Sequence, residues 1–233
     1  MESEVVHRRC LRSSLAVALG LLVGLTGASL LYSSLHPCPA DDFGQVQAGH
    51  LRRLDGNAEK GRVIFLGSST FQGLDTGSVT ARPLNLGLGG DTVQGLRERL
   101  RTYSSPKDAS AIVLNIGLND IVRGVEVDRL PYQQLLSELP VHVPLFVLGL
   151  QAVRRAVPDE EERINRAVVE ANARLSALCA ARRACRYLGN PVDSAVRSEP
   201  FLWEPDGLHL SAAGYVRLRA ALVQGLAAGG VAP

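Results

Sequence analysis

The alternation of short apolar runs with segments of helical periodicity most constrains how this chain can fold. Runs of four to seven residues, bounded by turn residues, are typical of buried strands. They lie at Arg62–Leu66, Pro83–Leu86, Ser110–Ile116, Pro144–Leu150 and Cys185–Leu188. Strands separated by helices predict an α/β fold in which helices cover both faces of a parallel sheet.

Apolar residues between these runs recur every three or four positions, as on one face of a helix. The longest stripe comprises Ile164, Val168, Ala171, Leu175 and Leu178. It follows Pro158 and the acidic stretch "DEEER", a typical first turn of a helix. Shorter stripes begin at Val93, Leu135 and Tyr215.

An uncharged segment at residues 13–35 is long enough to cross a bilayer. Arg8, Arg9 and Arg12 precede it, and the first charges after it are Asp41 and Asp42, so the positive-inside rule keeps the N-terminus cytoplasmic and exports the rest. We favour an uncleaved signal anchor, which predicts a single-pass membrane protein. The alternatives are a signal peptide cut after Ala28, which predicts secretion, and a buried core helix. Residues 36–60 then form a loose linker and lead-in, and residues 61–233 the domain.

Composition narrows the partners and the chemistry. The 25 basic and 23 acidic residues nearly balance and give no electrostatic footprint for nucleic acid. No Cys-x-x-Cys or Cys/His cluster occurs, so we expect no metal. Cys179 and Cys185 either bridge the end of a helix to the next strand or remain separate buried thiols.

Four loops expected at the carboxyl edge of the sheet carry polar residues. "FLGSST" ends the first strand with Ser69, "GLGGDT" contains Gly90, and "GLND" contains Asn119. "EPDGLHLS", before the last helix, places Asp206 three residues before His209. Each motif alone is also typical of a turn or a helix cap, but four of them in order at one edge favour chemistry.

Acyl transfer requires what these loops provide. A serine nucleophile needs a base, and the base needs an acid that fixes its tautomer, roles that Ser69, His209 and Asp206 can fill. The oxyanion needs preorganised donors, for which the Ser69 and Gly90 N–H groups and the Asn119 amide are suited.

These motifs resemble those of the SGNH, or GDSL-type, hydrolases, and most of all the bacterial branch near the platelet-activating factor acetylhydrolase subunits. The resemblance spans Val63 to Tyr215. It implies a three-layer α/β/α fold with a flavodoxin-like five-stranded sheet, and the same triad and oxyanion residues. The family's Gly-Asp-Ser-Leu reads Gly-Ser-Ser-Thr here, which puts Ser68 in place of the acid and makes it the alternative nucleophile.

The sequence thus predicts a serine esterase that needs no cofactor and acts on a short acyl ester, acetyl first, of a small molecule, glycan or lipid. Trp203 and Arg154 are weaker candidates for lining the substrate site, with packing and a solvated loop as the alternatives. Two other functions stay open: an envelope polysaccharide O-acyltransferase with the same triad, and a non-catalytic envelope protein with this fold.

Overall fold

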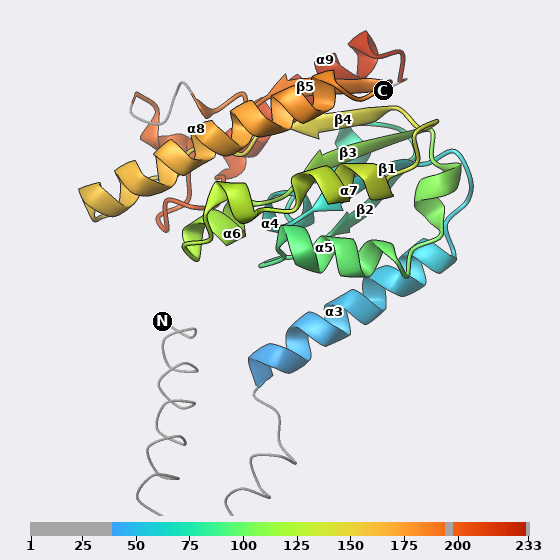
Figure 1. Cartoon of the computed structure of the whole chain (residues 1–233), viewed down its shortest axis with the longest axis horizontal. Coiled ribbons are helices and arrows are strands. Elements are labelled where there is room, and N and C mark those ends of the chain that lie inside the picture. Colours follow the sequence, from blue (N-terminus) through green and yellow to red (C-terminus); the bar gives the residue numbers. More distant parts are fainter. Residues whose placement is uncertain (1–38, 194–197, 232–233) are drawn as a thin grey trace, which may run out of the picture. The chain divides into compact units, whose positions relative to one another are not determined.

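The computed structural model describes residues 39–193 and 198–231, which include a five-stranded parallel sheet (Figure 1). The strands are β1 (Val63–Gly67), β2 (Pro83–Gly87), β3 (Ala111–Asn115), β4 (Leu145–Leu148) and β5 (Cys185–Gly189). Their order is β2-β1-β3-β4-β5, and all neighbours run parallel. This is the flavodoxin-like order, so the predicted fold class is confirmed.

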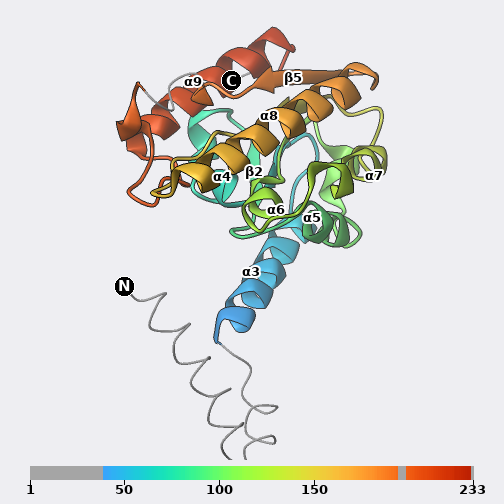
Figure 2. The same ribbon diagram turned by 60° about the vertical axis from the view of Figure 1, so that its left-hand side comes forward.

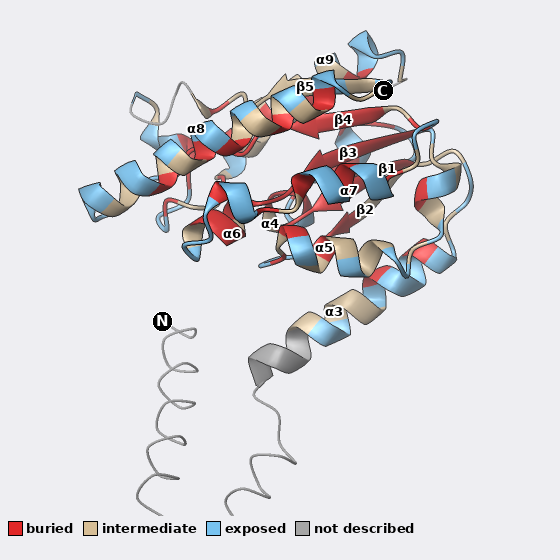
Figure 3. Ribbon diagram, viewed as in Figure 1, coloured by how far each residue is buried: buried red, intermediate tan, exposed pale blue. Residues whose placement is uncertain are grey.

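Helices cover both faces of this sheet (Figures 1 and 2). Their bounds are α4 (Ser69–Gln72), α5 (Val93–Leu100), α6 (Leu118–Val122), α7 (Tyr132–Glu138), α8 (Pro158–Ala180) and α9 (Ala212–Ala228). Ile64, Leu66 and Ile112 pack under α5, α7 and α8. Phe65 and Val113 form the core of the opposite face with Phe71 of α4 and with Leu218, Leu222 and Leu226 of α9. Burial on both faces explains why the three central strands, β1, β3 and β4, are almost entirely apolar (Figure 3).

Helix α3 (Pro39–Gly56) corrects the expectation of a loose segment at residues 36–60. Its last part belongs to the compact unit that begins at Ala48. There Leu51 is buried, and the Asp55 carboxylate accepts hydrogen bonds from the backbone and hydroxyl groups of Ser104 and Ser105. With a single buried leucine, the helix has too narrow an apolar stripe to be read from periodicity.

In the structure, the Sγ atoms of Cys179 and Cys185 form a disulfide. Cys179 lies at the end of α8 and Cys185 begins β5, so the bond closes the short turn between these two elements.

No helix within residues 39–193 and 198–231 combines the length and the apolar character that a bilayer crossing requires. The span predicted at residues 13–35 lies outside these residues.

Candidate active site

The turn between β1 and α4 presents Ser69. Ser68 is only 3% exposed, and its carbonyl oxygen accepts hydrogen bonds from the N–H groups of Phe71 and Gln72. Ser69 begins α4 and is half-buried, and its Oγ makes no hydrogen bond within the described part of the chain. Its N–H, in the first turn of the helix, has no helical acceptor either. The turn therefore offers the Ser69 hydroxyl rather than that of Ser68.

Asp206 and His209 meet in the loop before α9. His209 Nδ1 lies 2.6 Å from Asp206 Oδ2, and Asp206 Oδ1 accepts from the N–H groups of Leu208 (2.8 Å) and His209 (2.9 Å). Burial raises the pKa of Asp206, but these hydrogen bonds outweigh burial and leave the pKa below its usual value. The carboxylate thus stays ionised at neutral pH and accepts the Nδ1–H of His209, which leaves Nε2 free to act as a base.

The loop that carries this pair is fixed to the segment after β4. The Arg154 N–H donates to the Gly207 carbonyl oxygen (2.7 Å), and Trp203 Nε1 donates to the Ala152 carbonyl oxygen (3.0 Å). Trp203 is 4% exposed, so it packs beneath the loop, which corrects its expected place in a substrate wall. The Arg154 side chain is exposed and donates to the Pro200 carbonyl oxygen.

Gly207→Ala is expected to lower kcat by about 10²-fold, because a Cβ there would overlap the Arg154 carbonyl and displace the loop of His209. Gly207 also has a φ of +64°, which costs an L residue about 1–2 kcal/mol. Gly61→Ala is the matched control, since Gly61 has a φ of +76° and no atom within 4 Å of an added Cβ. Steady-state rates and thermal unfolding of both variants test this expectation. Unchanged kcat in Gly207→Ala would contradict it.

The predicted oxyanion residues lie in two loops that contact each other. Gly90 has a φ of +76°, a conformation that favours glycine, and its N–H has no partner in the described residues. Asn119 Nδ2, from α6, donates to the Asp91 carbonyl oxygen at 2.9 Å. Arg123, one helical turn further on, donates to the Gly90 carbonyl oxygen at 2.9 Å. Two donors from one segment therefore hold two consecutive carbonyl groups of the oxyanion loop.

Buried carboxylates fix this loop from beneath. Asp91 Oδ2 pairs with Arg99 Nη2 at 2.5 Å, and both side chains are largely buried. Asp120 Oδ2 accepts from the Val93 N–H at 3.1 Å, at the start of α5. Burial raises the pKa of Asp91 against the opposing influence of Arg99. Sequence reasoning missed this support, because no motif links the paired residues.

Asp193, which follows β5, forms a hydrogen bond with the segment after β4. Its Oδ1 accepts from the Ala152 N–H at 3.0 Å. Burial raises the pKa of Asp193 from 3.8 to about 6. Folding thus places a half-buried carboxyl group next to the backbone that supports the His209 loop.

Asp193→Asn is expected to increase the free energy of unfolding at pH 7.5 and to leave it unchanged below pH 4. Since the pKa is higher in the folded chain, that state binds more protons between pH 3.8 and about 6, and stability falls as pH rises through this range. Above it, the ionised group costs about 1–2 kcal/mol after allowance for solvent screening. Asparagine removes this cost and keeps the Oδ1 acceptor. Urea unfolding at both pH values tests this, with the exposed Asp128→Asn as control. An equal increase in the free energy of unfolding at the two pH values would contradict it.

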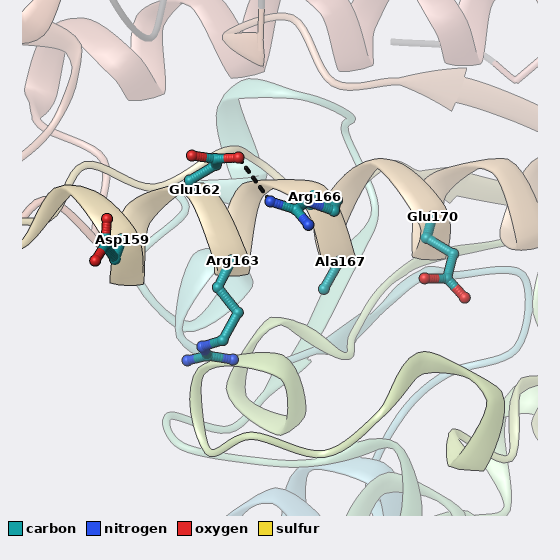
Figure 4. A pocket seen from close by; sticks show the side chains of 6 residues that line it. All are labelled: Asp159, Glu162, Arg163, Arg166, Ala167 and Glu170. Atoms are coloured by element: carbon teal, nitrogen blue, oxygen red, sulfur yellow. Dashed lines mark hydrogen bonds and ion pairs between the residues drawn. The ribbon is translucent and has the colours of Figure 1, made fainter.

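A hollow on the surface of α8 is lined by other residues than those described above. Among described residues it is lined by Asp159, Glu162, Arg163, Arg166, Ala167 and Glu170 (Figure 4). Glu162 and Arg166 form an ion pair at 2.6 Å across one helical turn. Its charges are mixed, and none of the predicted triad or oxyanion residues lines it, so it lies outside the candidate active site.

Comparison with known structures gives the same fold. A protein described as a platelet activating factor from Streptococcus pneumonia is 20% identical, covering 79% of this chain and 91% of its own, with a TM-score of 0.62. A GDSL-like lipase from Bacteroides thetaiotaomicron is 16% identical (78% and 97% covered, TM-score 0.64). An acetylxylan esterase from Geobacillus stearothermophilus is 16% identical (75% and 96% covered, TM-score 0.61).

Comparison with protein families assigns the sequence to a family. No curated protein is significantly similar to the chain. Residues 65–217, more than half of the chain, match the GDSL-like Lipase/Acylhydrolase family. This segment begins inside β1 and ends inside α9, so it contains the Ser69 turn, the Gly90 and Asn119 loops and the Asp206–His209 pair. The chain therefore belongs to the GDSL-like lipase/acylhydrolase family and is a hydrolase that acts on ester bonds.

Proposed function

We propose that the chain is a serine esterase that releases a short acyl group through an acyl-enzyme on Ser69. The observation that carries this proposal is the hydrogen bond from His209 Nδ1 to Asp206, which leaves Nε2 as the base. Ser69 Oγ attacks the ester carbonyl carbon as Nε2 takes its proton, and the same proton passes to the departing alcohol. Water, deprotonated by Nε2, then attacks the acyl-enzyme and releases the acid and the free serine.

The oxyanion of both tetrahedral intermediates accepts hydrogen bonds from the Ser69 and Gly90 N–H groups and from Asn119 Nδ2. The Asn119 amide uses one N–H on the Asp91 carbonyl, so its second N–H remains for the substrate. Donors held in this way stabilise the developing charge without reorganising during the reaction.

The exposure of the catalytic pair supports a short acyl group. The side chains of His209 and Asp206 are 44% and 49% exposed. Long acyl chains gain affinity when a deep apolar channel buries them, at about 0.8 kcal/mol per buried methylene group. A site open to solvent at its base and acid provides little such burial, and acetyl esters are therefore the favoured substrates.

The first test is hydrolysis of p-nitrophenyl esters from acetate to palmitate by the purified full chain in mild detergent. We expect kcat/KM to be highest for acetate and to fall as the acyl chain lengthens. A preference for palmitate would contradict the short-chain proposal. If p-nitrophenol is released slowly in water and faster when a sugar is added, the acyl group passes to a sugar hydroxyl. That result would favour the alternative function, O-acyl transfer by the same triad.

We also propose that residues 13–35 anchor the chain in the membrane with the esterase domain exported, as their lack of charge and the preceding arginines suggest. Protease treatment of intact cells expressing the full chain tests this topology. We expect the protease to degrade the domain while the cytoplasmic membrane stays intact. If the domain remained fully protected from the protease after the cell envelope outside that membrane had been opened, export would be contradicted.

A further inference from the structure

Gln151 is a buried polar residue directly after β4. It is 2% exposed, and its Nε2 lies 3.3 Å from Thr70 Oγ1 and 3.5 Å from the Leu208 carbonyl oxygen. Since a carbonyl oxygen only accepts hydrogen bonds, Leu208 fixes the orientation of the amide, with Nε2 toward these two partners.

The two partners are neighbours of catalytic residues. Thr70 follows Ser69 in α4. Leu208 precedes His209, and its N–H donates to Asp206 Oδ1. One amide group thus joins the helix that carries the nucleophile to the loop that carries the acid and base, two segments far apart in the sequence.

The Gln151 amide carries a cost that packing does not require. Its Oε1 is buried and has no hydrogen-bond partner among the described residues. A buried polar atom without a partner is unfavourable, whereas an unbranched apolar side chain of similar length would fill the same space without that cost. Stability alone would therefore favour methionine at this position.

We propose that Gln151 is a positioning residue that sets the His209 loop against the Ser69 helix. Proton transfer from Ser69 Oγ to His209 Nε2 depends on the separation of these atoms, and a displacement of about 1 Å can cost about 10²-fold in rate. Gln151 contacts neither atom and acts through Thr70 and Leu208. This inference rests on the proposed function of Ser69 as the nucleophile.

The test is Gln151→Met in the full chain, with the exposed Gln133→Met as control. We expect kcat on p-nitrophenyl acetate to fall about 10–100-fold with KM changed less than about twofold. Phosphonylation of Ser69 by a fluorophosphonate should slow by a similar factor. The unfolding temperature should be equal or higher, which a merely structural role would not produce. An unchanged kcat and labelling rate would overturn the proposal.

Thr70→Val provides a second variant that removes the acceptor and leaves Gln151 in place. It should lower kcat in the same direction, and the double variant should lose less than the product of the two single losses, because both remove one connection. Full kcat in Thr70→Val, or strictly multiplicative losses, would overturn the proposal even if Gln151→Met failed to fold. Absence of fluorophosphonate labelling in the wild type would instead overturn the proposed function, and this inference with it.

Discussion

Ser69→Ala is expected to lower kcat/KM on p-nitrophenyl acetate by about 10⁴-fold or more, because loss of a triad nucleophile leaves only binding and oxyanion stabilisation. Ser69 is half-buried at the start of α4, and its hydroxyl group makes no hydrogen bond to the described residues. Initial rates over a range of ester concentrations measure the loss. Fluorophosphonate labelling followed by peptide mass spectrometry identifies the residue that reacts.

Ser68→Ala is the matched control, since it removes a hydroxyl from the adjacent residue of the same turn. Ser68 is buried and caps α4 without a side-chain hydrogen bond. Its carbonyl oxygen, which accepts two N–H groups of α4, is unaffected by the substitution. We expect Ser68→Ala to keep kcat within about tenfold of the wild type, a change of at most about 1.4 kcal/mol. The reverse order of the two losses would make Ser68 the nucleophile.

The central strands β1, β3 and β4 could be predicted from the sequence because burial on both faces makes them almost entirely apolar. β1 and β3, whose five residues are all buried, show this most clearly. Each observed strand lies within two residues of its predicted bounds. Helix α3 escaped prediction because Leu51 is the only apolar side chain that it buries among its described residues, so it has no repeating apolar stripe.

The candidate catalytic residues could be named from short motifs, because each motif lies within a single loop. The groups that hold them could not. Arg99 reaches Asp91 across one helix, Arg123 reaches Gly90 from a different loop, and Gln151 connects two distant segments. Such contacts depend on how elements pack in three dimensions, and no local pattern encodes them. Trp203 shows the same limit, because its position in a loop of the sequence does not reveal that the ring is buried.

Asp206→Asn is expected to lower kcat by about 10²–10⁴-fold while leaving stability nearly unchanged. In the structure, Asp206 Oδ1 accepts two backbone N–H groups, and Oδ2 faces His209 Nδ1. Those N–H groups will keep the single carbonyl oxygen of asparagine on their side. The asparagine NH₂ group then faces Nδ1 and can only donate, so Nδ1 must accept and the imidazole proton moves to Nε2.

A histidine with its proton on Nε2 cannot take the proton of Ser69, so the loss arises from the tautomer rather than from a disturbed loop. Glu204→Gln is the control, because it removes an exposed carboxylate from the same loop and leaves the Glu204 N–H, which donates to the His209 carbonyl oxygen, in place. Rates on p-nitrophenyl acetate and thermal unfolding of both variants separate chemistry from folding. If Asp206→Asn kept more than about a tenth of the wild-type kcat, Asp206 would not control the tautomer, and Ser69 and His209 would have to work as a pair without an orienting acid.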